Sequence, residues 1–330
     1  MVFGCSGPAL TPAERAFFRD ADPFGFILFQ RNCDHPDQLR RLTAALRDAV
    51  GRADAPVLID QEGGRVARLK PPHWPAYPAP AAIAALGGAE AKEAAWLGAR
   101  LIADDLAALG ITIDCVPVLD IPVAGADAVI GDRALGDEPA AVATLGRAVC
   151  EGMLAGGVLP EIKHIPGHGR ATVDSHAALP RVDASRATLA ASDFAPFRAL
   201  ADMPWAMTAH IVYSAIEARA AATLSRAVIA QAIRGEIGFD GVLVSDDLSM
   251  RALGGSFADR AAGALAAGCD VVLHCNGDMK EMTEIADASG RLTPAARRRV
   301  DRAEARRGAA RAIDRGTLAA RFGALMARAA

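Results

Sequence analysis

The chain has 330 residues, 52% of them hydrophobic, and its 36 Lys and Arg nearly balance its 39 Asp and Glu, for a formal net charge of -3. This balance argues against a nucleic-acid partner, or an anionic membrane, bound through bulk charge. The six cysteines show no Cys-x-x-Cys spacing, so neither a disulfide framework nor a zinc ribbon is expected. No stretch approaches the ~18 apolar residues of a membrane span, and the N-terminal segment lacks the regions of a signal peptide. We therefore expect a cytoplasmic protein.

Short β-rich apolar runs alternate with helical patterns along the chain. A weak candidate strand at 2–5 comes first, and seven clear ones follow at 25–29, 56–60, 111–116, 158–164, 205–209, 241–245 and 270–274. Apolar residues recur at helical spacing over 39–50 and 142–153, and another helix runs to Leu109 with Gly110 as its expected C-cap.

Eight such units predict an α/β fold, a single-domain (β/α)8 TIM barrel over residues 1–330, with C-terminal helices over about 280–330 packed on it. A doubly wound sheet is the alternative. The Arg-rich stretch at 297–307 is interpreted as a solvated helix face.

Charged or titratable residues end or follow five of the apolar runs. They are Asp60, Asp120, His210, the pair 163–164 and the pair 246–247. Because the catalytic groups of parallel α/β barrels lie at the C-terminal ends of the strands, we expect these residues to meet at one end of the barrel. Any one of them could be structural, but five together indicate a functional site.

The segment 241–250, GVLVSDDLSM, places two adjacent carboxylates after a β-rich run. A carboxylate at this end of a barrel can serve as the nucleophile of a glycosidase. Asp246 directly follows the strand, so we predict that Asp246 points into the site and that Asp247 caps the following helix. Two capping aspartates are the alternative when the motif is taken alone.

The segment 163–176, KHIPGHGRATVDSH, is predicted to form an irregular loop over the site, because its proline and glycines forbid a continuous helix. The spacing of His164 and His168 could suggest zinc. The Pro-Gly pair between them makes joint presentation to a metal doubtful, and the lysine beside them disfavours a cation. We therefore expect no metal.

A dyad of Asp174 and His176 is the preferred interpretation of the same loop. Asp174 would orient the imidazole of His176, and His176 would transfer protons, a task suited to histidine near neutral pH. His164 and His168 are then interpreted as a sugar contact and as a hydrogen-bonding group that fixes the loop.

Two further motifs, 59–69 and 129–139, supply candidate binding residues. Asp60 could accept hydrogen bonds from vicinal sugar hydroxyls, and Arg68 and Arg133 could donate to hydroxyl or acetamido oxygens. Neither motif contains a GxGxxG or GxxxxGK[ST] pattern, so a nucleotide site is not supported. No cofactor is expected.

Six segments in this order resemble the family 3 glycoside hydrolases, and among them the bacterial β-N-acetylglucosaminidases (β-hexosaminidases). They are GFILFQRN (25–32), IDQEGGRV (59–66), PVLDI (117–121), IGDRALG (130–136), KHIPGHG with DSH (163–176) and SDDLSM (245–250).

The resemblance implies a (β/α)8 barrel and retaining hydrolysis of β-1,4-linked N-acetylglucosamine. It implies a nucleophile at Asp246, an acid/base at His176 with its partner Asp174, and sugar-binding roles as follows: Asp60, Arg68, Arg133, Lys163 and His164. Many relatives carry a second domain with a carboxylic acid/base, and this length leaves no room for one beside a full barrel. The proton donor is therefore expected on the barrel's own loops.

By the same resemblance, the expected substrate is a carbohydrate, a muropeptide with N-acetylglucosamine on anhydro-N-acetylmuramic acid that enters peptidoglycan recycling, and the protein is expected to be a monomer. Three other functions stay open: a metal-dependent barrel hydrolase, a β-glucosidase-like enzyme, and a sugar-binding protein without activity. Because histidine is a neutral base, phosphate would not be repelled from the site, and some phosphorolysis is conceivable.

Overall fold

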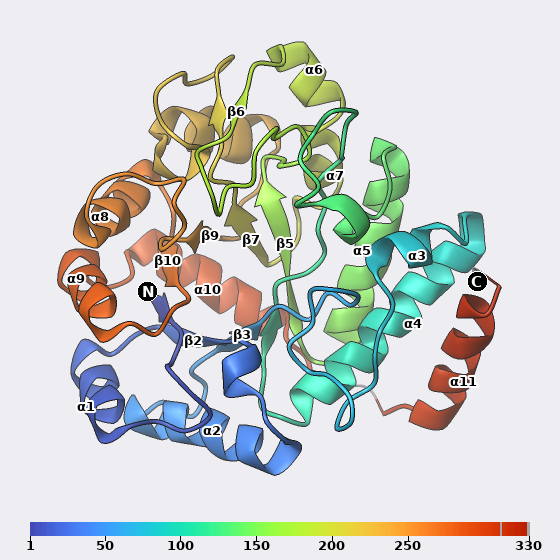
Figure 1. Cartoon of the computed structure of the whole chain (residues 1–330), viewed down its shortest axis with the longest axis horizontal. Helices are drawn as coiled ribbons and strands as arrows, with labels where there is room; N and C mark the ends of the chain where they lie inside the picture. The colour runs from blue at the N-terminus through green and yellow to red at the C-terminus, as the bar shows by residue number, and fades with distance from the viewer. Residues whose placement is uncertain (311, 329–330) are drawn as a thin grey trace.

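Eight parallel strands close into a barrel in a computed structural model that describes residues 1–310 and 312–328. Their order around the barrel is β1, β2, β3, β4, β5, β7, β9 and β10, and β10 pairs with β1 (Figure 1). The predicted (β/α)8 barrel is confirmed, and the doubly wound sheet is wrong because the barrel closes on itself. The strands are β1 (Val2–Phe3), β2 (Gly25–Leu28), β3 (Val57–Ile59), β4 (Ile113–Asp114), β5 (Leu159–Ile165), β7 (Trp205–Thr208), β9 (Val242–Asp247) and β10 (Val271–His274).

Each predicted run overlaps one of these strands, with differences at the ends. The strand β4 has only two residues, because the chain turns just after it, where the amide of Val116 donates to the carbonyl of Asp114 (2.8 Å). The strand β9 runs further than predicted and includes both aspartates. A separate pair, β6 (Arg181–Val182) and β8 (Val212–Tyr213), lies outside the barrel and was not predicted.

Helices surround the barrel (Figure 1). The predicted helices correspond to α2, α4 and α5, and their ends follow the glycine signals only approximately. Gly110 is not the cap of α4, which ends at Ala107; it is a left-handed residue (φ +75°) that turns the chain toward β4. The helices are α1 (Pro12–Ala21), α2 (Pro36–Ala49), α3 (Pro80–Ala84), α4 (Gly88–Ala107), α5 (Pro139–Ala155), α6 (Arg186–Ala191), α7 (Phe194–Ala199), α8 (Phe257–Ala267), α9 (Met279–Ser289), α10 (Pro294–Arg306) and α11 (Arg315–Met326), with short turns η1 (Gln30–Asn32), η2 (Gly131–Arg133) and η3 (Ala222–Leu224) and a π-helix η4 (Val228–Glu236).

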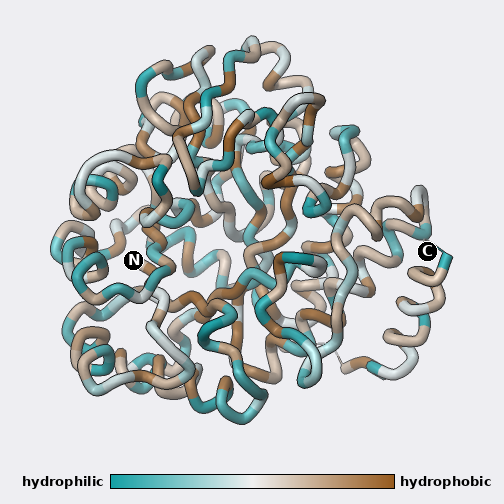
Figure 2. The backbone as a smooth tube through the Cα atoms, in the orientation of Figure 1, coloured by the Kyte–Doolittle hydropathy of each residue, from teal (hydrophilic) through white to brown (hydrophobic). Residues whose placement is uncertain are grey.

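The hydrophobic core has two main parts. One lies between the strands and the surrounding helices, and the other fills the barrel. Figure 2 shows hydrophobic residues in brown in the central part of the backbone. Val300 and Ala303 of α10 belong to the second part, so α10 closes the end of the barrel opposite the polar residues. One acidic residue is fully buried as well, Glu161 of β5. Its burial raises the pKa of its carboxyl to about 7.

The Arg-rich stretch is not simply a solvated face. Arg299 pairs with both Asp240 (3.0 Å) and Asp270 (2.9 Å), and Arg302 also pairs with Asp240 (2.7 Å), so α10 is fixed to the barrel. The next helix, α11, packs against α4. Within residues 1–310 and 312–328, no helix has the length and apolar character that crossing a membrane requires.

Candidate active site

A cavity of about 360 Å³ lies at the C-terminal ends of the barrel strands. All eight residues that were predicted to be catalytic or sugar-binding line it, although they come from segments up to 186 positions apart. These residues are Asp60, Arg68, Arg133, Lys163, His164, Asp174, His176 and Asp246. The apolar side chains of Phe29, Met207 and Met250 complete part of its wall. One cavity therefore holds charged groups, three histidines and apolar surface together, as small-molecule sites in proteins commonly do.

The ammonium group of Lys163 lies at the centre of a buried set of ion pairs. Its Nζ is 2.7 Å from Oδ1 of Asp60 and 2.7 Å from Oε1 of Glu62, and its side chain is 2% exposed. The second oxygen of Asp60 accepts from Arg68 (3.0 Å). Burial alone would raise the pKa of the Asp60 carboxyl, but Lys163 and Arg68 outweigh it and hold that pKa well below its usual range. Asp60 is thus a fixed anion that can accept hydrogen bonds.

Arg133 is held by a partner that the sequence did not assign to it. Its Nε and one terminal nitrogen donate to the two oxygens of Glu62, both at 2.8 Å, in a bidentate pair. The other terminal nitrogen donates to the carbonyl of Val129 (3.3 Å). Arg133 lines the cavity, but much of its donor capacity is already taken up by Glu62 and Val129.

Asp120 organises the start of the loop after β5. It is fully buried, and it accepts from the backbone amides of His164 (3.2 Å) and His168 (2.6 Å). Its Oδ2 lies 2.7 Å from Nδ1 of His164, which leaves Nε2 of that ring as the nitrogen free to meet a ligand. His168 contacts the hydroxyl of Ser175 through Nε2 (3.0 Å), and this contact fixes the loop. Burial lowers the pKa of His168 to about 4, so its ring is neutral at physiological pH.

Asp174 and His176 lie together at the edge of the cavity. Oδ1 of Asp174 is 2.7 Å from Nδ1 of His176 and also accepts from the backbone amide of His176 (2.9 Å). Burial of Asp174 raises its pKa, but the hydrogen bonds from His176 outweigh burial and the net pKa is lowered. The imidazole is 67% exposed, so its second nitrogen is accessible from the cavity side and from solvent. The geometry is that of a carboxylate orienting a histidine.

Asp246 lies near the end of β9, on the wall of the cavity. Its Oδ1 accepts from the backbone amide of Asp247 (2.8 Å). Burial favours the neutral acid, yet the nearby rings of His210 and His164, together with that amide, outweigh burial and lower the pKa of Asp246 below its usual value. Asp246 is therefore an anion at neutral pH, as a nucleophile has to be.

The prediction that Asp247 caps the following helix is wrong. The next helix, α8, begins ten residues later and is capped by Ser256. Asp247 instead accepts from the amides of Ser249 (3.0 Å) and Cys275 (3.1 Å), and it ties the end of β9 to the end of β10. The bond to Cys275 crosses between strands, so no local pattern in the sequence could reveal it.

Three supporting groups were given no individual role by sequence reasoning: Glu62, Asp120 and His210. His210 contacts Thr223 through Nδ1 (2.7 Å) and the carbonyl of Asp247 through Nε2 (3.0 Å), directly behind the two aspartates. Asp120 and His210 were expected near the site because they end apolar runs, whereas Glu62 was not singled out although it follows β3 closely and the same signal applies to it. Within residues 1–310 and 312–328, no group of three or more His, Cys, Asp and Glu is arranged to hold a metal ion.

Comparison with known proteins agrees with this architecture. Residues 13–307 match the Glycosyl hydrolase family 3 N terminal domain. The chain is similar to a β-hexosaminidase of Alkalilimnicola ehrlichii, with 40% identity over 283 residues, which cover 84% of this chain and 80% of that protein.

Solved structures show the same similarity. The chain resembles the structure of NagZ from Neisseria gonorrhoeae in complex with N-trifluoroacetyl-D-glucosamine (TM-score 0.85, 32% identity), covering 100% of this chain and 96% of that one. It also resembles a glycoside hydrolase family 3 β-N-acetylglucosaminidase from a Paenibacillus species (TM-score 0.88, 32% identity), covering 98% of this chain and 67% of that one.

Proposed function

The chain belongs to glycosyl hydrolase family 3, and from that premise we propose that it is a retaining β-N-acetylhexosaminidase that removes terminal β-1,4-linked N-acetylglucosamine. The observation that carries the proposal is the shared cavity, which has an anionic Asp246 in its wall and an oriented Asp174–His176 pair at its edge. The relative from Alkalilimnicola ehrlichii is a β-hexosaminidase, and the Neisseria structure holds a glucosamine derivative; both support this choice of sugar.

The first step is attack of Asp246 on the anomeric carbon. The carboxylate forms a covalent bond to that carbon while the bond to the leaving oxygen breaks, and His176 gives its proton to that oxygen. Asp174 orients the imidazole for this transfer because its Oδ1 lies 2.7 Å from Nδ1. Because His176 is exposed at the cavity edge, the loop over 165–176 has to bring the ring inward when the sugar binds.

The second step is hydrolysis of the glycosyl-enzyme. His176, now neutral, takes a proton from water, and the oxygen of that water attacks the anomeric carbon as the bond to Asp246 breaks. Two displacements at one carbon return the sugar with its original configuration. Both steps use the same two groups, so neither requires a resident metal or cofactor.

Sugar recognition is assigned to the charged groups around Lys163. Asp60 accepts hydrogen bonds from hydroxyl groups, while Lys163, Arg68 and the Nε2 side of His164 face the same hydroxyls. Arg133 donates hydrogen bonds to the acetamido group of the sugar, with the N–H groups that are not already bonded to Glu62 and Val129. The substrate that fits a cytoplasmic enzyme of this kind is a muropeptide carrying N-acetylglucosamine on anhydro-N-acetylmuramic acid, consumed in peptidoglycan recycling.

Trapping of the covalent intermediate tests the proposal. A 2-fluoro or 5-fluoro derivative of the sugar should inactivate the protein, and peptide mapping should place the label on Asp246. Asp246→Ala should lower hydrolysis of an aryl N-acetylglucosaminide at least about a thousandfold. A label on Asp247, or an Asp246→Ala protein as fast as wild type, would refute the assignment.

A metal-dependent hydrolase on the same barrel is the competing enzyme class. The ammonium group of Lys163 lies 2.7 Å from both Asp60 and Glu62, and this positive charge among the carboxylates disfavours a divalent cation there. Full activity after prolonged dialysis against a chelator is expected, and loss of activity that added zinc restores would favour the competing class.

A further inference from the structure

The C-terminal helix α11 lies beyond residue 307, where the family match ends, and contacts the molecule at a distance from the sugar site. Phe322 and Leu325 of α11 pack with Leu97 and Leu101 of α4 in a small apolar cluster. Phe322 also lies close over Gly98 of α4, where an added Cβ would meet the phenyl ring at 3.1 Å. Figure 1 shows α11 at the outer edge of the molecule, beside α4 and on the side of α4 away from the strands.

Arg315, the first residue of α11, makes the polar contacts of this attachment. Its guanidinium pairs with Asp104 (2.7 Å) and Asp105 (2.6 Å) of α4 and reaches the hydroxyl of Tyr77 (3.5 Å). The Tyr77 hydroxyl donates in turn to Asp105 (2.7 Å). We call Arg315, Asp105 and Tyr77 the C-terminal clasp.

The segment that follows Tyr77 supports the loop after β3. The carbonyl of Tyr77 accepts from the amide of Gly64 (2.9 Å). At Gly63, which has φ +98°, a Cβ would lie 2.3 Å from the carbonyl oxygen of Pro78, so the two stretches of backbone touch directly. The turn over 62–66 is therefore held in place by the residues that the clasp fixes.

Glu62 begins that turn, and its side chain contacts two cationic residues that line the sugar site. Its amide donates to the carbonyl of Val66 (2.9 Å), and its side chain is 1% exposed. The carboxylate holds Lys163 and both donating nitrogens of Arg133. A shift of the turn would move the anion that orients these two cations.

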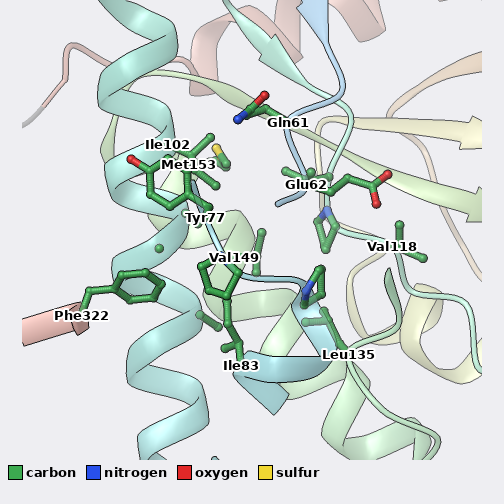
Figure 3. A pocket seen from close by; sticks show the side chains of 17 residues that line it. Gln61, Glu62, Tyr77, Ile83, Ile102, Val118, Leu135, Val149, Met153 and Phe322 are labelled. Atoms are coloured by element: carbon green, nitrogen blue, oxygen red, sulfur yellow. The ribbon is translucent and has the colours of Figure 1, made fainter. Parts of the chain in front are cut away.

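The space beneath Glu62 is incompletely packed. A cavity of about 40 Å³ lies between the turn, α4 and α5, and apolar side chains make up most of its wall. Figure 3 shows Phe322 and Ile83 on one side of this cavity and Glu62 on another, with Tyr77 near the α4 side. Since side chains do not fill this space, apolar packing alone leaves the turn room to move, and the polar clasp has to restrain it.

We propose that the C-terminal clasp positions Glu62, and through it Lys163 and Arg133, so that α11 sets the affinity of the sugar site. Arg315 and Tyr77 are positioning residues that touch no substrate. The expected effect on catalysis rests on the proposed function. The effect on the 62–66 turn does not.

The test compares three variants: Arg315→Ala, Tyr77→Phe and, as a control, Arg321→Ala. Arg321 stands on the same helix but pairs with Glu93 and touches none of the clasp residues. Amide hydrogen exchange of the full-length protein without substrate should become at least about tenfold faster at Gly64 in the first two variants and stay unchanged in the control.

Kinetics with an aryl N-acetylglucosaminide provide the second readout. KM should rise about tenfold in Arg315→Ala with kcat within about twofold of wild type, because binding is weakened without loss of a reacting group. Arg315→Lys, which can still pair with one carboxylate, should restore part of the lost affinity.

Unchanged exchange at Gly64 in both Arg315→Ala and Tyr77→Phe would overturn the proposal. So would an equal increase in the Arg321→Ala control, since that result would mean that any loosening of α11 has the same effect. If the wild-type protein does not hydrolyse the glycoside at all, the proposed function fails, whereas the exchange result still decides the role of the clasp.

Discussion

Replacement of Glu62 by glutamine tests the most heavily charged buried part of the site. Two anions, Asp60 and Glu62, face three cations, Lys163, Arg133 and Arg68. Glu62→Gln keeps the shape of the side chain and leaves one anion for three cations. Lys163 keeps its ion pair with Asp60 (2.7 Å), so most of the lost ion-pair stabilisation is lost at Arg133.

The magnitude follows from the position of Arg133. Its side chain is 10% exposed, and in Glu62→Gln it keeps only neutral acceptors, the glutamine amide oxygen and the carbonyl of Val129 at 3.3 Å, while the glutamine NH2 group cannot accept from it. Breaking a buried ion pair while one charge stays behind costs about 3–5 kcal/mol. We expect Glu62→Gln to lower the free energy of unfolding by that amount, and to raise KM because the sugar ligands lose their orientation.

Equilibrium urea denaturation followed by tryptophan fluorescence measures the effect. Asp132→Asn is the matched control, because the Arg65–Asp132 pair belongs to the same loops but both side chains are about half exposed (48% and 47%). That pair should contribute at most about 1 kcal/mol. A loss in Glu62→Gln no larger than in Asp132→Asn would refute the reasoning, as would a Glu62→Gln, Arg133→Met double variant no more stable than the sum of the single changes predicts.

Four further outcomes are expected. Asp174→Asn should lower kcat about 10²- to 10⁴-fold with little change in stability, because His176 loses its orienting anion while the pair is half exposed; unchanged kcat would remove Asp174 from the mechanism. As the pH decreases from about 6.5 to 4, the histidine is protonated in the unfolded state but stays neutral in the folded state, where burial lowers the pKa of His168. The free energy of unfolding should therefore decrease by up to about 3 kcal/mol over this range, and His168→Gln should reduce this pH dependence in urea titrations. Glu161 should give the opposite pH dependence. Because its pKa is raised in the folded state, stability is lost as the pH rises from about 4.5 through 7, and the Glu161→Gln variant should be more stable than wild type at pH 8 but not at pH 4. Product analysis with and without phosphate should give free sugar in both cases, and sugar 1-phosphate would show that phosphorolysis competes.

The sequence by itself determined the order of strands and the residues at their ends. The apolar runs, and the segments between them in which apolar residues recur at helical spacing, are local patterns that can be recognised in the sequence. A parallel strand that is buried on both faces is apolar along its whole length, so it appears as a continuous apolar run. The carboxylates and histidines that end these runs are visible for the same reason, because they interrupt apolar segments. This signal led to the prediction of Asp246 and Asp60 as site residues, whereas His176 was predicted from its spacing to Asp174 and from the family resemblance.

Tertiary structure decided what those residues touch. The contacts of Glu62 with Arg133, of Asp120 with His164, and of Asp247 with Cys275 span from 28 to 71 positions in the sequence. Each of them forms because closure of the barrel brings the ends of neighbouring strands to one rim, and no periodicity in a single segment records such a meeting. The sequence therefore shows which groups can do chemistry at this site, whereas the closed barrel fixes their charge states and partners, because both depend on burial and on neighbours that are distant along the chain.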